Sequence, residues 1–234
     1  MPKYRVAYAK VDVARFLSQL EVLRTFNRAL RRSSLPLAYT QGFNPHPKVS
    51  YGPSLSVGMA GLNEYFDLEL ERPVDVEESV ERLNLHLPQG LLVKAMAPLP
   101  PFASGLSKVI DCGWYRISLP QRVLSQDTLA HLMELRMMAE PWLKSREKDG
   151  KVFDVRRGIL ELRVDPRKKA CILDLLVRVG EGEAPIRVIL EAIWEKFFEG
   201  IPLSLTSVTR VGLYRFQGEE LVTPLGETKG LWEE

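Results

Sequence analysis

The stretch Lys3-Tyr4-Arg5-Val6-Ala7-Tyr8-Ala9-Lys10-Val11 alternates large apolar residues with Arg5 and small residues. This period of two is typical of a β-strand with one buried face. The chain then changes period, because Ser18 and Glu21 form an S-x-x-E capping box that opens a helix. Apolar residues recur at helical spacing up to Ser33-Ser34, namely Leu20, Leu23, Phe26 and Leu30. The sequence therefore predicts a strand followed by an amphipathic helix.

The following residues complete a first unit. We expect a short strand at 35–39, a loop rich in glycine and proline at 41–61, and a strand at 66–70. Asp75 and Glu78 look like a second capping box, and Pro88 and Gly90 end the helix that they open. A last strand is expected at 91–95. The order β-α-β-β-α-β over residues 3–96 is that of a ferredoxin-like unit.

The plan then repeats after a proline-rich segment. We expect strands at 115–119, 159–164, 171–179 and 203–216, helices at 129–137 and 185–197, and an added hairpin around Asp149-Gly150. The predicted fold class is α+β, with two tandem ferredoxin-like units and antiparallel sheets. The predicted domains are a first unit at 1–97, a linker at 98–107, a second unit with the inserted hairpin at 108–217, and a loose acidic tail at 218–234.

Composition limits the class of protein. The chain has 234 residues, of which 45% are apolar and 26% charged, so it is long and apolar enough to bury a core. It has no apolar run of membrane-spanning length, and residues 1–5 do not resemble a signal peptide, so we expect a cytoplasmic protein. Cys112 and Cys171 are too far apart for a paired zinc or iron–sulfur motif, and we expect no metal site in this chain.

Charge is placed unevenly along the chain. Residues 1–52 hold nine basic and two acidic side chains, a balance of +7, whereas the whole chain has a net charge of +2. The remaining residues therefore carry −5. Such asymmetry indicates an anionic partner at one end, and the alternative is a solvated basic helix face without a partner.

One polar loop carries most of the chemistry. Pro45 and Pro47 stiffen the backbone around His46, aromatic residues could stack unpaired bases, and amide side chains could bond base edges. The alternative is a packed surface loop with Phe43 in the core. The residues predicted to bind nucleic acid are Arg24, Arg28, Arg31, Arg32, Tyr39, Gln41, Phe43, Asn44, His46, Lys48, Tyr51, Arg156, Arg187 and Arg210.

Two residues are candidates for catalysis. His46 is the histidine best placed for acid or base chemistry, and Asp154 would be the candidate if an essential aspartate is needed. For Asp154 the alternative is an ion pair with a nearby arginine. No catalytic role is assigned from spacing alone, because an orienting partner is not visible in a sequence.

Three segments together resemble a known family. Residues 16–21 (FLSQLE), residues 28–32 (RALRR) and above all residues 35–47 (LPLAYTQGFNPHP) are similar to the radical SAM-linked protein family, a bacterial domain of unknown function (DUF2344). The resemblance implies an association with radical SAM proteins that carry a cobalamin-binding region. Such a partner would hold an iron–sulfur cluster, S-adenosylmethionine and cobalamin. This chain lacks the C-x-x-x-C-x-x-C motif, so no such cofactor is expected in it.

Three functions remain open. The preferred one is a non-catalytic RNA-binding or substrate-presenting accessory protein of a separate radical SAM enzyme, in RNA or ribosome-related modification. The second is an RNA-processing or RNA-modifying enzyme in its own right, similar to an endoribonuclease or a pseudouridine synthase. The third is a protein-binding adaptor that uses exposed strand faces and Trp232.

Overall fold

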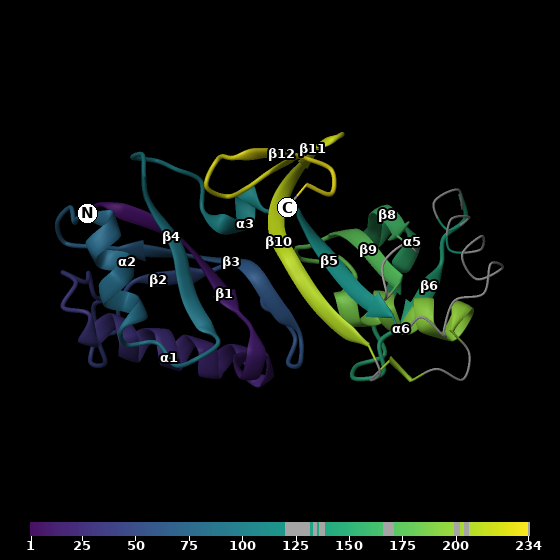
Figure 1. Cartoon of the computed structure of the whole chain (residues 1–234), viewed down its shortest axis with the longest axis horizontal. Coiled ribbons are helices and arrows are strands. Elements are labelled where there is room, and N and C mark those ends of the chain that lie inside the picture. The colour runs from purple at the N-terminus through teal and green to yellow at the C-terminus, as the bar shows by residue number, and fades with distance from the viewer. Residues whose placement is uncertain are drawn as a thin grey trace. The chain divides into compact units, whose positions relative to one another are not determined.

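The computed structural model describes residues 1–119, 132, 135, 139–165, 171–198, 202–203 and 206–233. It has α+β architecture, and its strand pairs are mostly antiparallel. The chain divides into two compact units, Met1–Ile110 with Gly212–Glu234, and Asp111–Val211 (Figure 1). Most of the helix predicted at 129–137 lies outside the described residues.

The first unit has a sheet in the order β4-β1-β3, with β2 also paired to β3. All of these pairs are antiparallel. Its elements are β1 (Lys3–Lys10), the 3-10 helix η1 (Asp12–Phe16), α1 (Gln19–Arg32), β2 (Val49–Tyr51), β3 (Ala60–Glu69), α2 (Val76–Asn84), β4 (Leu91–Leu99) and α3 (Leu106–Val109).

The start of α1 confirms the capping box. The Glu21 N–H donates to Ser18 Oγ at 3.3 Å, and the Ser18 N–H donates to Glu21 Oε2 at 2.7 Å. The Ser18 hydroxyl also donates to Glu21 Oε2 at 2.7 Å, and this bond, together with that from the Ser18 N–H, lowers the pKa of the Glu21 carboxyl. The buried side of α1, including Phe26 and Leu30, packs on Tyr4, Val6 and Tyr8 of β1. The apolar stripe of the helix therefore faces the sheet, and its polar face is left to solvent.

The strand predicted at 35–39 is not regular. Leu37 bridges Leu70 and Tyr39 bridges Pro47 as isolated contacts, and the regular strand is β2. Pro36 lacks an N–H group, so it cannot donate in a continuous ladder. The loop is consequently shorter than the predicted 41–61.

Arg5 shows that the second face of β1 is also buried. Its Nη1 donates to Pro224 O at 3.0 Å, and its Nη2 donates to Ser104 O at 2.9 Å. These two carbonyls belong to segments that the sequence predicts to be a linker and a loose tail. Both segments lie against this face and supply the acceptors that the N–H groups of a buried guanidinium need.

The C-terminal residues form a hairpin where a loose tail is predicted. β11 (Glu220–Val222) pairs with the end of β10 (Ser207–Gln217) and with β12 (Thr228–Gly230), all antiparallel. Leu221 is buried. Backbone hydrogen bonds to the neighbouring strands hold these polar residues in the sheet, and the hydropathy of a sequence does not reveal such pairing. Trp232 is half-buried.

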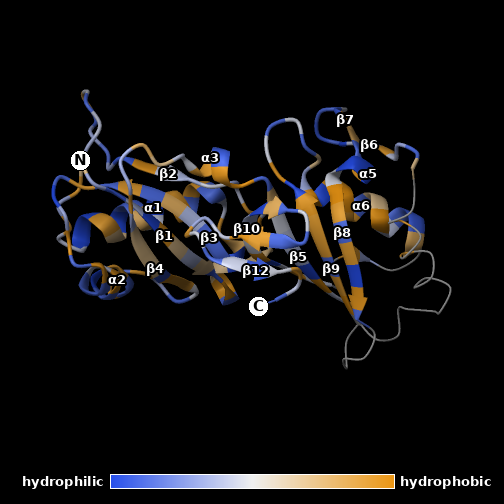
Figure 2. Cartoon of the chain, turned by 90° about the horizontal axis from the view of Figure 1, so that it is seen from above, coloured by the Kyte–Doolittle hydropathy of each residue, from blue (hydrophilic) through white to orange (hydrophobic). Residues whose placement is uncertain are grey.

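The second unit has the strand order β10-β5-β9-β8, and α6 packs against α5 and β6. Pairs β5–β9 and β8–β9 are antiparallel. Figure 2 shows β8 and β9 hydrophobic over most of their length. The elements of the second unit are β5 (Cys112–Leu119), β6 (Leu143–Ser145), β7 (Val152–Asp154), α5 (Val155–Gly158), β8 (Ile159–Asp165), β9 (Cys171–Arg178) and α6 (Ile186–Phe197). β6 and β7 form the hairpin around Asp149-Gly150.

A buried carboxylate organises one face of this second sheet. Asp174 is 0% exposed and accepts from Trp114 Nε1 at 2.9 Å, from Arg116 Nε at 2.9 Å and from Arg163 Nη2 at 2.8 Å. The charge of Asp174 is thus compensated by two arginines from the neighbouring strands. Among the helices that the structure describes, none is long and apolar enough to cross a membrane.

Candidate nucleic-acid interface

The exposed face of α1 carries four arginines, Arg24, Arg28, Arg31 and Arg32. Arg24, Arg28 and Arg31 are spaced by four and three residues, so they lie on one side of the helix. Arg28 Nη2 donates to Thr25 Oγ1 at 3.3 Å. Within the described ranges, none of the four forms an ion pair with a carboxylate. We call these four residues the arginine face.

Two members of the arginine face, Arg31 and Arg32, lie in the last turn of α1, where they complement the negative end of the helix dipole. That interaction is a stabilising role that needs no ligand. It does not account for Arg24 and Arg28, which lie further from the helix end. Four guanidinium groups without carboxylate partners give this surface a positive field that favours an anion.

The predicted loop follows α1 and stands on a hydrogen-bonded base. The Ala38 N–H donates to Glu69 O at 3.1 Å, the Lys48 N–H donates to Ala38 O at 2.8 Å, and the Thr40 N–H donates to His46 O at 2.9 Å. The base of the loop is therefore joined to the end of β3. We call residues 40–46 the tip loop.

His46 braces the tip loop. Its backbone N–H donates to Thr40 Oγ1 at 3.2 Å, and its Nδ1 lies 3.2 Å from Thr40 Oγ1 and 3.4 Å from Asn44 O. These contacts use one ring nitrogen to hold the loop closed. Thr40 is missing from the residues predicted to bind, because a threonine in a polar loop has no distinguishing pattern. The candidate base thus has a hydroxyl and a carbonyl as its neighbours.

The tip loop itself is exposed. Phe43 has a relative exposure of 106%, so the alternative that places Phe43 in the core is wrong. Gln41, Asn44 and His46 are also exposed, and Tyr39 is 38% exposed at the base. Gly42 has a φ of +126°, a conformation that favours glycine. The structure therefore brings five of the predicted loop residues to one solvent-facing projection.

Two predicted residues of this region have other partners. Tyr51 is half-buried, with its ring centroid 5.3 Å from Phe66 and 6.5 Å from Phe26, so its faces are not open for stacking on a base. Burial also raises the pKa of its hydroxyl. Tyr51 turns inward because β2 returns the chain to the sheet. Lys48 lies 3.5 Å from Glu69 and is half-buried.

Each predicted arginine of the second unit has a bonding partner within that unit. Arg210 lies inside β10 with 1% exposure, and its Nη1 donates to Tyr115 Oη at 3.1 Å, so it is not exposed to bind nucleic acid as predicted. It is buried because residues 210–214 of β10 are all buried, so that both faces of the strand are covered there. Arg187 pairs with Glu191 at 3.5 Å, and Arg156 donates to Ile159 O at 3.0 Å.

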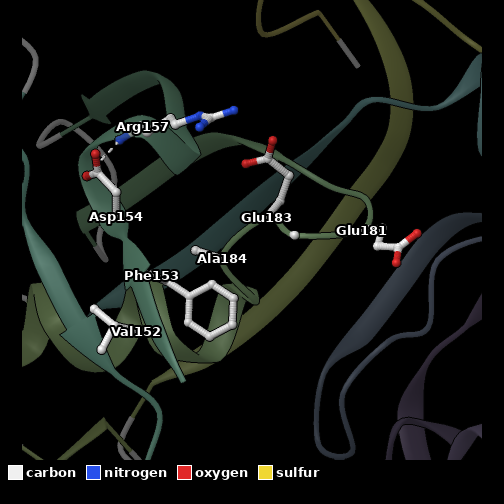
Figure 3. Close-up of a pocket in the computed structure, with 8 residues that line it drawn as sticks. Val152, Phe153, Asp154, Arg157, Glu181, Glu183 and Ala184 are labelled. Carbon is white, nitrogen blue, oxygen red and sulfur yellow. Dashed lines mark hydrogen bonds between the residues drawn. The ribbon is translucent and has the colours of Figure 1, made fainter. Parts of the chain in front are cut away.

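Asp154 is a helix cap. Its Oδ1 accepts from the N–H of Arg157 at 3.2 Å (Figure 3). It also accepts from the N–H of Trp142 at 3.2 Å. The carboxylate therefore accepts from one backbone donor in α5 and from one just before β6, whereas an ion pair with an arginine is the predicted alternative. This arrangement gives Asp154 a structural role without any substrate.

Asp154 also lines an open pocket of about 280 Å³ in the second unit. Glu181 and Glu183 lie on the loop after β9, and Arg157 is the basic residue in the lining. In Figure 3 the Glu181 side chain points away from Asp154 and Arg157. Three carboxylates with one guanidinium make a poor site for phosphate groups. The described residues contain no group of three histidine, cysteine or acidic side chains able to hold a metal ion.

The exposed basic residues and the exposed polar loop that suit an anion thus both lie in the first unit. The fold and this surface define an α+β protein of two compact units with an exposed basic helix and a braced, projecting loop. The chain belongs to the DUF2344 family, described as "Uncharacterized protein conserved in bacteria", whose model matches residues 3–185.

Other comparisons add little. No curated protein matches the chain. Among solved structures, an unknown protein from Galdieria sulphuraria is 12% identical, with 88% of this chain and 95% of that chain covered and a TM-score of 0.28. A putative glycine cleavage system transcriptional repressor is 8% identical, with 88% and 94% covered and a TM-score of 0.21. At these scores neither likeness carries an argument about fold or function.

Proposed function

We propose that this chain is a non-catalytic RNA-binding accessory protein that presents RNA to a separate enzyme. The observation that carries the proposal is the arginine face, four exposed guanidinium groups on α1 without carboxylate partners among the described residues. Arginine side chains at this spacing suit the phosphates of a nucleic acid backbone. The exposed tip loop, which follows α1 in the chain, supplies polar and aromatic groups.

The proposed partner is a radical SAM enzyme of the cobalamin-binding type, acting in RNA or ribosome-related modification. This part rests on the resemblance of residues 35–47 to the radical SAM-linked proteins. The iron–sulfur cluster, S-adenosylmethionine and cobalamin would be held by the partner. The work of this chain would be to bind and orient the substrate in the cytoplasm.

We further propose that both units are ferredoxin-like. The orders β4-β1-β3-β2 and β10-β5-β9-β8, each read with its intervening helices, support this assignment. In such a unit the helices lie on one face of the sheet, which puts the exposed side of α1 on the outer surface. The assignment explains the position of the arginine face and does not itself specify a function.

Co-purification tests the proposal. The tagged chain would be recovered from its own host, its bound RNA sequenced, and its bound proteins identified before and after nuclease treatment. We expect defined RNA species together with a radical SAM protein. A protein partner that is retained after nuclease treatment, with no enriched RNA, would contradict the proposal and favour an adaptor. Turnover of RNA by the purified chain, lost in His46→Ala or Asp154→Ala, would instead favour an enzyme.

A further inference from the structure

Phe43 is the most exposed aromatic side chain of the described residues, with a relative exposure of 106%. A phenyl ring in water gives up the free energy that its burial would provide. An apolar ring at the end of a polar loop therefore needs an explanation. One explanation is chance, since single exposed apolar residues are common on protein surfaces. The structure of the loop distinguishes Phe43 from such a case.

The loop holds Phe43 on a braced support. Thr40 bonds to His46 through both its backbone and its hydroxyl, at 2.9 Å and 3.2 Å. His46 Nδ1 lies 3.4 Å from the carbonyl oxygen of Asn44, the residue that follows Phe43, so the chain is also held on the C-terminal side of Phe43. Pro45 fixes one further backbone dihedral. Ordering this loop in advance reduces the entropy that would be lost when Phe43 binds a ligand.

The neighbours of Phe43 are polar. Gln41 precedes Phe43 and Asn44 follows it in the chain, and both amide side chains are exposed. Chain length limits the Cα separation of Arg31 and Tyr39 to about 28 Å, so one short oligonucleotide can reach both the arginine face and the base of the loop. An exposed aromatic ring, exposed amides and nearby guanidinium groups within that reach can together supply stacking, edge bonding and phosphate contacts.

We propose that this site takes an unpaired stretch of RNA, with a base stacked on Phe43 and the backbone on the arginine face. The inference rests on the proposed RNA-binding function and specifies its substrate class. In a duplex the base faces are covered by their neighbours, and the major groove of A-form RNA is too narrow for side chains to read. Phe43 can contribute to binding only when bases are free to leave the stack.

The experiment compares two RNA probes on the full chain. A labelled mixed-sequence RNA of about a dozen nucleotides, long enough for one such site, is titrated as a single strand and as a duplex with its complement, by fluorescence anisotropy. We expect tighter binding of the single strand. We expect Phe43→Ala to weaken single-strand binding about 5- to 100-fold, with little change for the duplex. Phe43→Trp should retain the affinity.

Phe102 provides a matched control, because it is 104% exposed in the same unit and lies outside the tip loop. Phe102→Ala should leave the affinity of both probes unchanged. Equal affinity for single strand and duplex, or an unchanged affinity in Phe43→Ala, overturns this inference. If RNA binding in that case is lost when the charges of the arginine face are reversed, the proposed function still stands and only the role of Phe43 is refuted. If the wild-type chain binds neither probe, both proposals fail.

Discussion

The guanidinium of Arg5 and the carboxylate of Asp67 form a two-point ion pair across β1 and β3. Nε lies 2.7 Å from Oδ1 and Nη2 lies 2.9 Å from Oδ2. Arg5 is 3% exposed, its Nη2 also donates to Ser104 O, and its Nη1 donates to Pro224 O. One side chain thus joins the first strand of the chain to the segment before α3 and to the C-terminal hairpin.

We expect Asp67→Ala to lower the free energy of unfolding by about 3–5 kcal/mol, because it leaves a buried guanidinium without its carboxylate. The double variant Arg5→Met/Asp67→Ala should be less destabilised than the single one, since the unpaired charge is gone. Urea unfolding followed by circular dichroism measures both. Strictly additive effects of Arg5→Met and Asp67→Ala would contradict the coupling.

The Arg5→Met variant should also loosen the C-terminal hairpin. Loss of the bond to Pro224 O removes one of the attachments of residues 218–230 to β1. We expect faster amide hydrogen exchange in β11 and β12 than in the wild-type chain. An unchanged exchange rate there would show that the pairing with β10 alone holds the hairpin.

Tyr51 and Tyr4 form a matched pair for the effect of a buried hydroxyl. Tyr51 Oη has no hydrogen-bond partner among the described residues, whereas Tyr4 Oη accepts from the Val74 N–H at 3.1 Å. We expect Tyr51→Phe to raise the free energy of unfolding by about 1 kcal/mol and Tyr4→Phe to lower it by a similar amount. Destabilisation by both changes would indicate that Tyr51 has a partner after all.

Cys112 should be unreactive in the folded chain. Burial raises the pKa of its thiol, and the charge of Asp111 adds to this effect. In a Cys171→Ser background, we expect a thiol reagent to label Cys112 only on unfolding, with little acceleration between about pH 7 and pH 9. Because the pKa is higher in the folded than in the unfolded state, its contribution to stability is lost as the pH rises. Rapid labelling under native conditions would contradict this.

Local patterns predicted the parts of the fold that local rules control. The strand that contains Tyr4, Val6 and Tyr8 and the capping box of Ser18 and Glu21 are both confirmed, but β1 is buried on both faces where one buried face is predicted. The hairpin at residues 218–230 was missed because its polar residues are held by backbone pairing and by Arg5, a partner far away in the chain. Pairing between distant segments leaves no periodic signal.

The candidate site was predicted only in part for a related reason. The exposure of Arg24, Arg28 and Arg31 follows from helical spacing alone, since the apolar stripe fixes which side faces the sheet. The loop has no such rule. Phe43 and Tyr51 are both aromatic residues in a polar segment, yet one is exposed and the other packs on Phe66. Which one turns inward depends on where β2 joins β3.

The most direct test is the salt dependence of single-stranded RNA binding. The triple variant Arg24→Glu/Arg28→Glu/Arg31→Glu is compared with the wild-type chain and with a control of equal charge change at exposed residues, Arg72→Glu/Lys108→Glu/Lys148→Glu. We expect the α1 variant to bind more weakly and its slope of log K against log salt to become shallower by about 2, roughly 0.7 for each RNA phosphate that the chain no longer neutralises. The control should keep the wild-type slope. An unchanged slope in the α1 variant, or an equal loss of affinity in the control, would contradict the assignment of RNA binding to the arginine face.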